Sequence, residues 1–420
     1  MKKILLSDTN QLLLFVVGII LFYSIGFNLD ENSSGGAPGD FYTFHYPAVL
    51  HFYNTPLKDA VYDYSSASTP LFYIINAYLI PFANNEVLLR ITNLMMSLSI
   101  IYIFYQTITL KYKDISLINR LLLSSIVAIS PYFKSIAIWA NNDNLAYFFF
   151  IISLFNLQKY YQTKSFKYSI LVITSMILAT LTRQYYIVIT LFLIYLMIGM
   201  DIKKLKQNSL IVFTSFILLL PFFHLINIWG GLTPPSYQHH SSFSLNSIPY
   251  IFSFITFYSL PFIIFISIDL IKNKKFSNKK VFLYIVLGIT YLTMSINFSF
   301  YSTGGGFIVK VVQLIDSILN IHIANYLFLL LSMLGFIFTL YLITLSKNNI
   351  ALVVPLIFLI TTNVIFQKYA DPMLNIFLIT LISYKQHDRI LLHNNYFVIS
   401  LFFYNLFFYF IALIYYNDLL

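Results

Sequence analysis

A carboxylate with neighbouring polar aromatics interrupts one of the most apolar parts of this sequence. Residues 36–56 read GAPGDFYTFHYPAVLHFYNTP, and they place Asp40 behind a Gly/Pro-rich approach with His45 and Tyr46 following it. We expect a short amphipathic helix over 41–54. Asp40 is then either the cap of that helix or a functional group, because ionisable side chains near a bilayer are costly and tend to carry function.

A second carboxylate occurs in WANNDNLAYFFF, residues 139–150. Asp143 lies between two long apolar runs, where it either caps the next helix or joins Asp40 at a shared site. The two segments connect neighbouring apolar runs, so their carboxylates can converge. We therefore treat Asp40 and Asp143 as the candidate catalytic pair.

We expect three isolated cations to lie at a similar depth, near the outer surface of the membrane. Lys134 precedes Asp143 by nine residues, Arg183 stands in LTRQYY and Lys368 stands in FQKYADP. Each either extends its charge to the membrane surface or binds an anion, and the guanidinium of Arg grips phosphate with a fork of donors. Several cations at one depth suit the head group of an anionic lipid.

The remaining polar segments carry weaker signals. WGGLTPPSYQHHSSFSLNSIPYIFSF, residues 229–254, contains His239 and His240, which are adjacent and so cannot face one metal ion from a helix or a strand; a solvated polar loop is the plainer interpretation. TGGGF, residues 303–307, lacks the Lys and Ser/Thr of a phosphate loop. No HExxH motif, nucleophile elbow or nucleotide-binding domain is visible, and the absence of cysteine excludes thiolate and disulfide chemistry.

The elements that position these residues are membrane helices. The chain has 420 residues, of which 59% are hydrophobic and 10% charged, with a net charge of +10 and a mean hydropathy of +0.78. A soluble domain carries about 25% charged residues, so we expect an all-α polytopic membrane protein. It forms one domain over residues 1–420. The AT-rich-type composition and the missing cysteines favour a bacterial source and the cytoplasmic membrane; a eukaryotic source would place the chain in the endoplasmic reticulum.

Most of the basic residues fall into clusters that we assign to the cytoplasmic side, because Lys and Arg concentrate in cytoplasmic loops. The same distribution argues against nucleic acid as a partner and leaves membrane lipids around the chain. Each segment between two such clusters must then cross an even number of times. By this rule we expect residues 168–200 and 349–384 to form helical hairpins, and residues 70–83 to form an interfacial or re-entrant helix. The prediction is about 13 crossings, with residues 11–27 as a retained anchor and 28–86 as the largest outer loop. The predicted crossings are at 11–27, 87–110, 119–139, 145–161, 168–183, 185–200, 208–228, 248–270, 281–300, 325–345, 349–366, 372–384 and 395–417.

These features resemble the GT-C superfamily of glycosyltransferases, which use polyprenyl-phosphate sugars. Asp40 stands where the superfamily has a catalytic carboxylate in its first outer loop, and STPLFYIINAYLI resembles its Pro-Leu-Tyr juxtamembrane segment. Asp143 in NDNLAYFF resembles the acidic position of the second outer loop. QKYADP resembles the late Arg-Tyr-x-x-Pro element, with Lys368 in place of the arginine.

Within the superfamily, the motifs are most similar to those of the α-1,2-glucosyltransferases that use dolichyl-phosphate glucose. FHYP (44–47), LTRQYYIVI (181–189) and the Gly-Gly loop at 230–231 with its downstream histidines carry this similarity. A lone Asp40 stands where that family has an Asp-Glu pair. The resemblance implies that the substrate contacts come from His45, Tyr46, Asp63, Gln184, His239 and His240.

The resemblance implies an inverting transfer of a hexose, such as glucose, from a polyprenyl phosphate to a lipid-linked saccharide or another extracytoplasmic glycan. In that reaction we expect Asp40 to act as the general base, and Arg183, Lys368 and Lys134 to bind the donor phosphate. The sequence leaves open whether Asp143 orients the acceptor or holds a divalent cation such as Mg²⁺ or Mn²⁺. Two rival interpretations are a flippase for lipid-linked saccharides, which lacks support from an inverted repeat, and a polymerase or ligase of surface polysaccharides.

Overall fold

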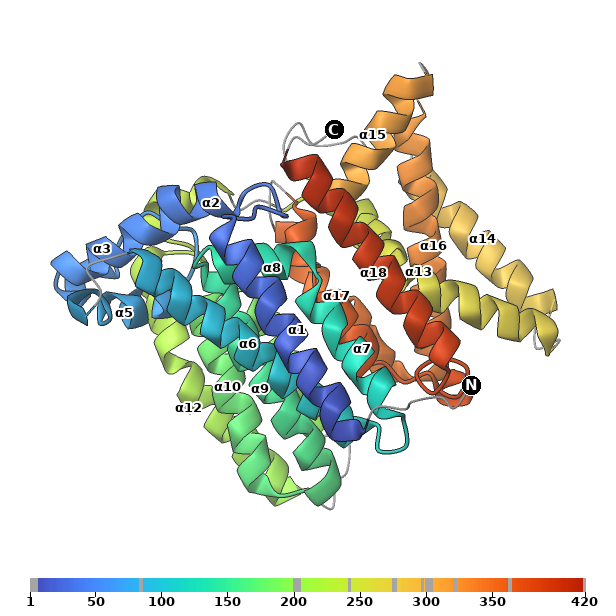
Figure 1. Ribbon diagram of the computed structural model, residues 1–420, viewed down its shortest axis with the longest axis horizontal. Helices are drawn as coiled ribbons and strands as arrows, with labels where there is room; N and C mark the ends of the chain where they lie inside the picture. The colour runs from blue at the N-terminus through green and yellow to red at the C-terminus, as the bar shows by residue number, and fades with distance from the viewer. Residues whose placement is uncertain are drawn as a thin grey trace. The chain divides into compact units, whose positions relative to one another are not determined.

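The computed structural model describes residues 7–82, 86–198, 205–240, 243–273, 278–295, 298, 305–319, 323–361 and 365–417. Within these residues all regular structure is helical, in agreement with the expected all-α fold (Figure 1). The chain divides into two compact units. Unit 1 comprises residues 1–239 and 406–420, and unit 2 comprises residues 240–405, so helix α18 (Asn395–Tyr416) begins in unit 2 and ends in unit 1.

Six of the described helices are long and apolar enough to cross a membrane. They are α1 (Asp8–Asn28), α6 (Glu86–Lys111), α12 (Leu205–Trp229), α13 (Ser247–Lys272), α16 (Ala324–Leu345) and α18. A helix rises 1.5 Å per residue, so about 20 residues match a hydrocarbon core of about 30 Å. The chain is therefore an integral membrane protein by helix length and composition, while the predicted count of 13 crossings is not confirmed.

A seventh candidate span is a bent pair of helices, α7 (Leu117–Ala128) and α8 (Pro131–Ile138), which meet at 64°. The break has a local cause. Pro131 lacks an N–H and occupies the first turn of α8, where that loss is harmless, and the Ser130 hydroxyl accepts a hydrogen bond from the N–H of Phe133 at 3.1 Å. The bend turns α8 into a separate element that is buried throughout.

The other helices of unit 1 are α9 (Asn142–Thr163), α10 (Phe166–Thr182) and α11 (Tyr186–Ile198). The predicted crossings at 145–161, 168–183 and 185–200 thus fall on helices, although α10 and α11 are shorter than a comfortable span. α9 packs along α6 and α10. Its first turn is capped by Asn141, whose side chain accepts from the N–H of Asp143 at 3.0 Å, so Asp143 is not the cap.

The first outer loop of the prediction folds into short helices. They are α2 (Ala37–Asp40), a π-helical turn η1 (Phe41–His45), α3 (Tyr46–Asn54), α4 (Leu57–Ala60), α5 (Leu71–Ala77) and a 3₁₀ turn η2 (Ile80–Phe82). The expected helix over 41–54 and the expected short helix in 70–83 are both present. α5 contacts α9 and α10, which brings this loop against the ends of the helices that carry Asp143 and Arg183.

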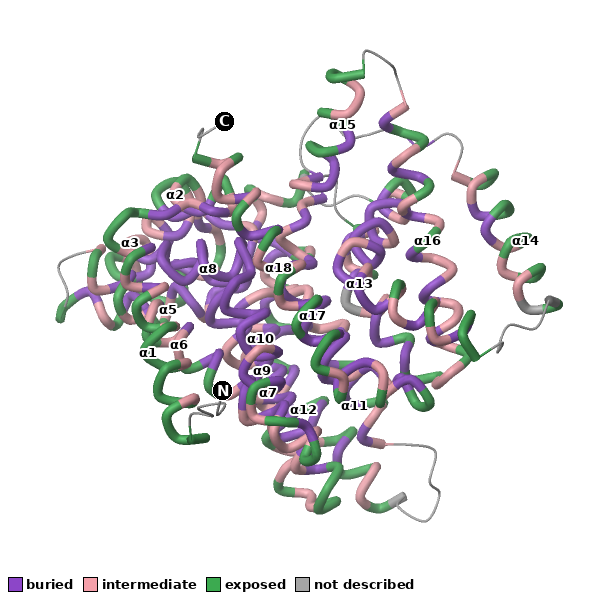
Figure 2. Tube along the Cα trace, turned by 45° about the vertical axis from the view of Figure 1, so that its right-hand side comes forward, coloured by how far each residue is buried: buried purple, intermediate pink, exposed green. Residues whose placement is uncertain are grey.

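Burial separates the lipid-type surfaces from the interior of each unit (Figure 2). α1 exposes apolar side chains along most of its length, and only 11% of the residues in its 18-residue apolar stretch are buried. Bare apolar surface of that extent is stable when hydrocarbon covers it. α8, by contrast, is buried on every side and lies inside unit 1.

Unit 2 contains α13, α14 (Asn278–Met294), α15 (Phe307–Leu319), α16, α17 (Met373–Thr380) and 3₁₀ turns at Lys347–Leu352, Val354–Thr361, Gln367–Tyr369 and Lys385–His387. α13 and α16 approach closely because Gly335 has no side chain: a Cβ there would lie 2.0 Å from the carbonyl oxygen of Phe252. A remaining 3₁₀ turn, Pro235–His240, follows α12.

Two predicted crossings in unit 2 take another form. Residues 349–366 fold mainly into 3₁₀ turns instead of one α-helix. In 372–384 the only α-helix is α17, which has eight residues, all of them buried. Eight residues rise about 12 Å, which is too short to cross hydrocarbon. α17 is apolar because it lies in a protein interior, and composition does not distinguish that setting from lipid.

Candidate active site

The centre of the candidate site is a buried ion pair between Asp143 and Arg183. Asp143 stands in the first turn of α9, and Arg183 follows the last residue of α10. The guanidinium grips the carboxylate at two points: Nε donates to Oδ1, and Nη2 donates to Oδ2 at 2.8 Å. Only 2% of the Asp143 side chain and 15% of the Arg183 side chain are exposed. This geometry is the bidentate fork that makes Arg–carboxylate pairs strong and directional.

Two tyrosines complete the environment of the carboxylate. Tyr132 donates to Oδ2 of Asp143, and Tyr185 donates to Oδ1 at 3.0 Å. Each carboxylate oxygen therefore accepts two hydrogen bonds, which fills its usual capacity of about four lone-pair positions. Asp143 holds and orients Arg183, and its oxygens are committed to protein donors.

Arg183 remains a cation despite its burial. A guanidinium stays protonated in proteins, and the Asp143 carboxylate beside it compensates its charge. Nη1 donates to the hydroxyl of Ser68 at 2.7 Å. A guanidinium has five N–H groups, and three of them find acceptors among the described residues. The other two have no acceptor among the described residues.

A second set of hydrogen bonds links the first outer loop to the same place. Nδ1 of His45 lies 3.0 Å from the hydroxyl of Tyr73, and Tyr73 donates to Ser66 at 2.6 Å. Since the single Tyr73 proton goes to Ser66, the Tyr73 oxygen accepts from His45 and from Nδ2 of Asn142 at 3.2 Å. Ser66 in turn lies 3.3 Å from Ser68, which contacts Arg183.

Residues 65–69, SSAST, form a serine loop that these contacts hold in position. Besides the bond from Arg183 to Ser68, Nε2 of Gln184 donates to the carbonyl oxygen of Ala67 at 2.6 Å. Thr69 donates to the carbonyl oxygen of Thr180 at 2.8 Å. The loop is thus fixed on the end of α10. Sequence reasoning did not identify it, because Ser and Ala in a loop carry no motif.

Asp40 ends α2 immediately before the π-helical turn Phe41–His45. Its side chain is partly buried. A π-helical turn places residues five apart above one another, and such turns occur often at functional sites; this one places Asp40 and His45 about one turn apart. The turn packs on the second outer segment, since Phe41 and Tyr42 contact the ring of Trp139 at centroid distances of 6.2 and 5.7 Å. Tyr46 packs on Phe41.

Lys134 lies in a different buried cluster. Its Nζ donates to Oε2 of Glu31 at 2.5 Å and to the hydroxyl of Tyr409 at 2.7 Å, and it lies 3.4 Å from the ring centroid of Phe22. Tyr409 also donates to Oε1 of Glu31 at 2.9 Å. The ammonium has three donors, and all three directions are taken by α1, α18 and the segment after α1. Lys134 therefore pairs with Glu31 in the interior of unit 1.

A related ion pair joins Arg90 in α6 to Asp30 in the segment after α1. Arg90 donates to Asp30 at 2.5 Å and to the carbonyl oxygen of Ile138 at 3.1 Å. Its guanidinium carbon lies 3.9 Å from the ring of Trp139 and 4.8 Å from the ring of Phe27. Glu31 and Asp30 are consecutive, so one short segment after α1 receives both cations. Their partners were not identified from sequence because they lie 60 and 103 residues away.

Asp63, His239 and His240, three of the predicted substrate residues, lie apart from the ion pair in the sequence. The Asp63 carboxylate accepts from the hydroxyl of Ser236, which ties the outer loop to the turn Pro235–His240. His239 is exposed. The side chain of His240 lies outside the described residues. Within the described part of the chain, Asp63 bonds to Ser236, whereas Arg183 bonds to Asp143 and Ser68.

Lys368 belongs to unit 2, and its environment is described within that unit alone. Its Nζ lies 5.0 Å from the ring centroid of Phe366. The preceding Gln367 is held by the glycine segment, since its Oε1 accepts from the N–H of Ile308 at 3.0 Å. Gly306 is required there: its φ is +78°, and a Cβ would lie 2.6 Å from the side chain of Gln367. The structure thus places the described residues 305–308 against the beginning of QKYADP.

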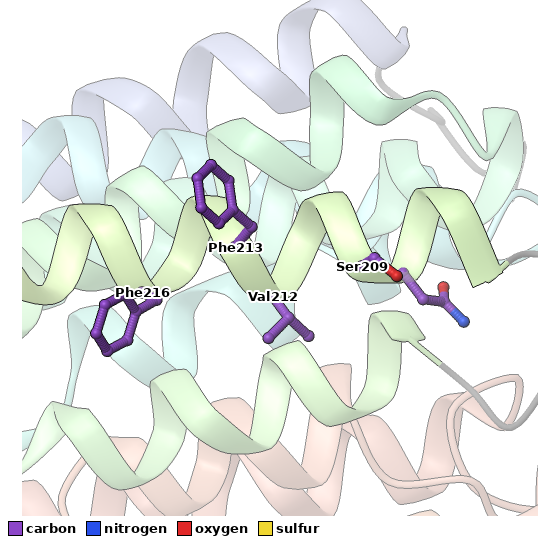
Figure 3. Close-up of a pocket in the computed structure, with 5 residues that line it drawn as sticks. Ser209, Val212, Phe213 and Phe216 are labelled. Atoms are coloured by element: carbon purple, nitrogen blue, oxygen red, sulfur yellow. The ribbon is translucent and has the colours of Figure 1, made fainter.

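An open apolar groove of about 560 Å³ lies elsewhere, along the first half of α12 (Figure 3). Val212 and Phe216 point to one side of the helix and Phe213 to the other, with Ser209 at the polar end. All three apolar side chains are more than half exposed. The groove has the character of a lipid-facing helix surface and contains none of the ionisable residues discussed above.

No group of three or more His, Cys, Asp or Glu side chains that could hold a metal ion occurs among the described residues. Asp143 was the predicted candidate for a cation ligand, and its oxygens accept from Arg183, Tyr132 and Tyr185. The comparisons add no assignment: no family model, no curated protein and no solved structure matches this chain.

Proposed function

We propose that the protein is a membrane glycosyltransferase that moves a hexose from a polyprenyl-phosphate donor to a lipid-linked saccharide or another extracytoplasmic glycan, with inversion. The observation that carries this proposal is Arg183. Its side chain is 15% exposed, its guanidinium is fixed by Asp143 at the ends of apolar helices, and two of its N–H groups have no acceptor among the described residues. A lipid-borne phosphate is the anion that reaches such a place in a membrane protein.

The contact between the outer loop and the helices of Asp143 and Arg183 supports the proposal. His45, Ser68, Asn142 and Arg183 come from three segments that are far apart in sequence, and one set of hydrogen bonds links them. In this proposal the segments form the extracytoplasmic wall of the site. The protein lies in the cytoplasmic membrane, with the chemistry on the outer face.

The chemistry requires a base and a stabilised leaving group. Asp40 takes the proton from the acceptor hydroxyl as the acceptor oxygen bonds to C1 of the sugar. The bond from C1 to the phosphate oxygen breaks, and its electron pair leaves with the polyprenyl phosphate. Arg183 neutralises the charge that develops there. Asp143 is a positioning residue for Arg183, and we assign Lys134 to its ion pair with Glu31 instead of to phosphate.

The test uses the purified full chain with radiolabelled polyprenyl-phosphate sugars and an acceptor lipid. We expect donor consumption with release of free polyprenyl phosphate. Asp40→Asn should lower turnover by about 10²–10⁴-fold, the usual contribution of a general base, while donor binding survives. Asp59→Asn, at an exposed position of the same outer loop, is the matched control and should retain turnover.

Two results would contradict the proposal at different levels. Near-normal turnover of the Asp40→Asn protein would remove Asp40 from the role of base. Absence of bond cleavage with every donor tested, together with movement of labelled lipid across a vesicle membrane, would favour the flippase instead.

A further inference from the structure

Two side-chain oxygens beside the ion pair have no hydrogen-bond donor among the described residues. They are Oδ1 of Asn142, which precedes Asp143, and Oε1 of Gln184, which follows Arg183. Both atoms are buried, and Asn142 is fully buried as a residue. A buried acceptor without a donor carries a desolvation cost, so native structures rarely leave one unmet without a reason.

The orientation of both carboxamides is fixed by their nitrogens. Nε2 of Gln184 donates to the carbonyl oxygen of Ala67 at 2.6 Å, and a carbonyl only accepts. Nδ2 of Asn142 donates to Tyr73, whose own proton goes to Ser66. Exchanging oxygen and nitrogen in either group would break these bonds. In each carboxamide, the nitrogen is therefore the atom that contacts Ala67 or Tyr73, and the oxygen is the atom without a donor.

Hydrogen-bond donors without an acceptor thus occur on Arg183, and hydrogen-bond acceptors without a donor occur on the neighbouring Gln184 and on Asn142. Arg183 supplies two N–H groups, which match phosphate oxygens, and its neighbours supply two carboxamide oxygens, which match hydroxyl protons. A sugar phosphate needs this combination: donors for the phosphate and acceptors for the ring hydroxyls.

We propose that Asn142 and Gln184 determine the specificity for the donor sugar, each accepting a hydrogen bond from a different ring hydroxyl. This inference rests on the proposed glycosyltransferase function and names the part of the donor that the site recognises. Both oxygens are shielded from solvent in the structure, so binding of the sugar requires the side chains that cover them to move. A site that bonds a hydroxyl with a buried polar group rejects an analogue that lacks it.

The experiment compares a series of monodeoxy polyprenyl-phosphate sugars, each lacking one hydroxyl, with the parent sugar that gives the highest turnover. The measured quantity is the ratio of kcat/KM for the parent to kcat/KM for each analogue. We expect the unaltered protein to discriminate by at least about tenfold against two analogues, the equivalent of one hydrogen bond each. In Asn142→Ala one of these ratios should fall to about 1, and in Gln184→Ala the other should fall, while the remaining ratios stay unchanged.

Asn144→Ala is the matched control. Asn144 is a buried asparagine in the same turn of α9, and its Oδ1 also lacks a donor, but its Nδ2 bonds the backbone of Asn93 and the hydroxyl of Ser97 on α6. It should lose thermal stability and keep every sugar ratio. If Asn142→Ala does not fold, the Gln184→Ala protein tests the proposal with its own sugar ratio.

The proposal is overturned if the Asn142 and Gln184 variants lower kcat/KM for the parent and all analogues equally, because ordered water then meets the two oxygens. It is also overturned if Asn144→Ala changes the same ratio as Asn142→Ala. Absence of transfer by the unaltered protein with any donor is a different outcome, since it refutes the glycosyltransferase assignment itself.

Discussion

Replacing Asp143 by asparagine tests how the centre of the site is held together. The change keeps the size of the side chain and removes its charge. Four donors converge on the carboxylate, from Arg183, Tyr132 and Tyr185, whereas an amide oxygen accepts only about two. The amide NH₂ would face protons that also seek an acceptor.

The cost follows from the burial of the pair. Removing one partner of a buried ion pair leaves the other charge uncompensated and typically costs about 3–5 kcal/mol. Asp143 is 2% exposed and Arg183 15% exposed, so solvent recovers little of this. We therefore expect Asp143→Asn to lower the free energy of unfolding of unit 1 by about 3–5 kcal/mol.

The sequence offers a convenient probe for this measurement. The only two tryptophans, Trp139 and Trp229, both lie in unit 1 and are both buried. Their fluorescence during denaturant titration in detergent micelles therefore reports the unfolding of this unit. Asp59→Asn, at an exposed position, should change the unfolding free energy by no more than about 0.5 kcal/mol.

The double variant Asp143→Asn, Arg183→Met decides between loss of charge balance and loss of packing. Removing the cation as well relieves the uncompensated charge, so the double variant should be at least as stable as Asp143→Asn alone. An Asp143→Asn protein within about 0.5 kcal/mol of the unaltered protein, or strictly additive losses in the double variant, would refute the argument.

Two further changes test the second buried cluster with the same fluorescence assay. Lys134→Met should cost about 3–5 kcal/mol by leaving Glu31 buried and unpaired, and adding Glu31→Gln should recover much of this; a Lys134→Met protein of unchanged stability would contradict the pairing. Gly26→Ala should cost about 1–3 kcal/mol, because its Cβ would lie 2.9 Å from Oε2 of Glu31. Gly18→Ala in the same helix meets no atom within 4 Å and should raise stability by about 0.5–1 kcal/mol; equal effects of the two glycine changes would show that the close contact at Gly26 is not the cause.

Part of the site could be read from the sequence because its residues are chemically conspicuous. Arg183 and Asp143 were identified as isolated charges between apolar runs, and the structure brings them into direct contact. Their roles were harder to predict. A carboxylate that binds substrate and one that holds an arginine look identical in a linear pattern, and only the four converging donors distinguish them.

The partners of the buried cations could not have been predicted. Lys134 and Glu31 are 103 residues apart, and Tyr409 follows Lys134 by 275 residues. No local periodicity relates such positions. Likewise, no chemical motif marks Asn142, Tyr73 or the serine loop. Their arrangement depends on the orientation of the Asn142 carboxamide and of the Tyr73 hydroxyl proton.

The sequence by itself determined that this chain is an all-α membrane protein, because apolar runs of about 20 residues match the thickness of hydrocarbon and too few charges exist to cover a water-facing surface. It also located most helix positions and the short helices of 36–56 and 70–83. Only the tertiary structure decided which apolar segments are buried in protein, as α8 and α17 are. A pattern of hydrophobicity records the need for an apolar neighbour but not whether that neighbour is lipid or protein. Tertiary structure also decided which charges pair, because the partners lie far apart in the sequence.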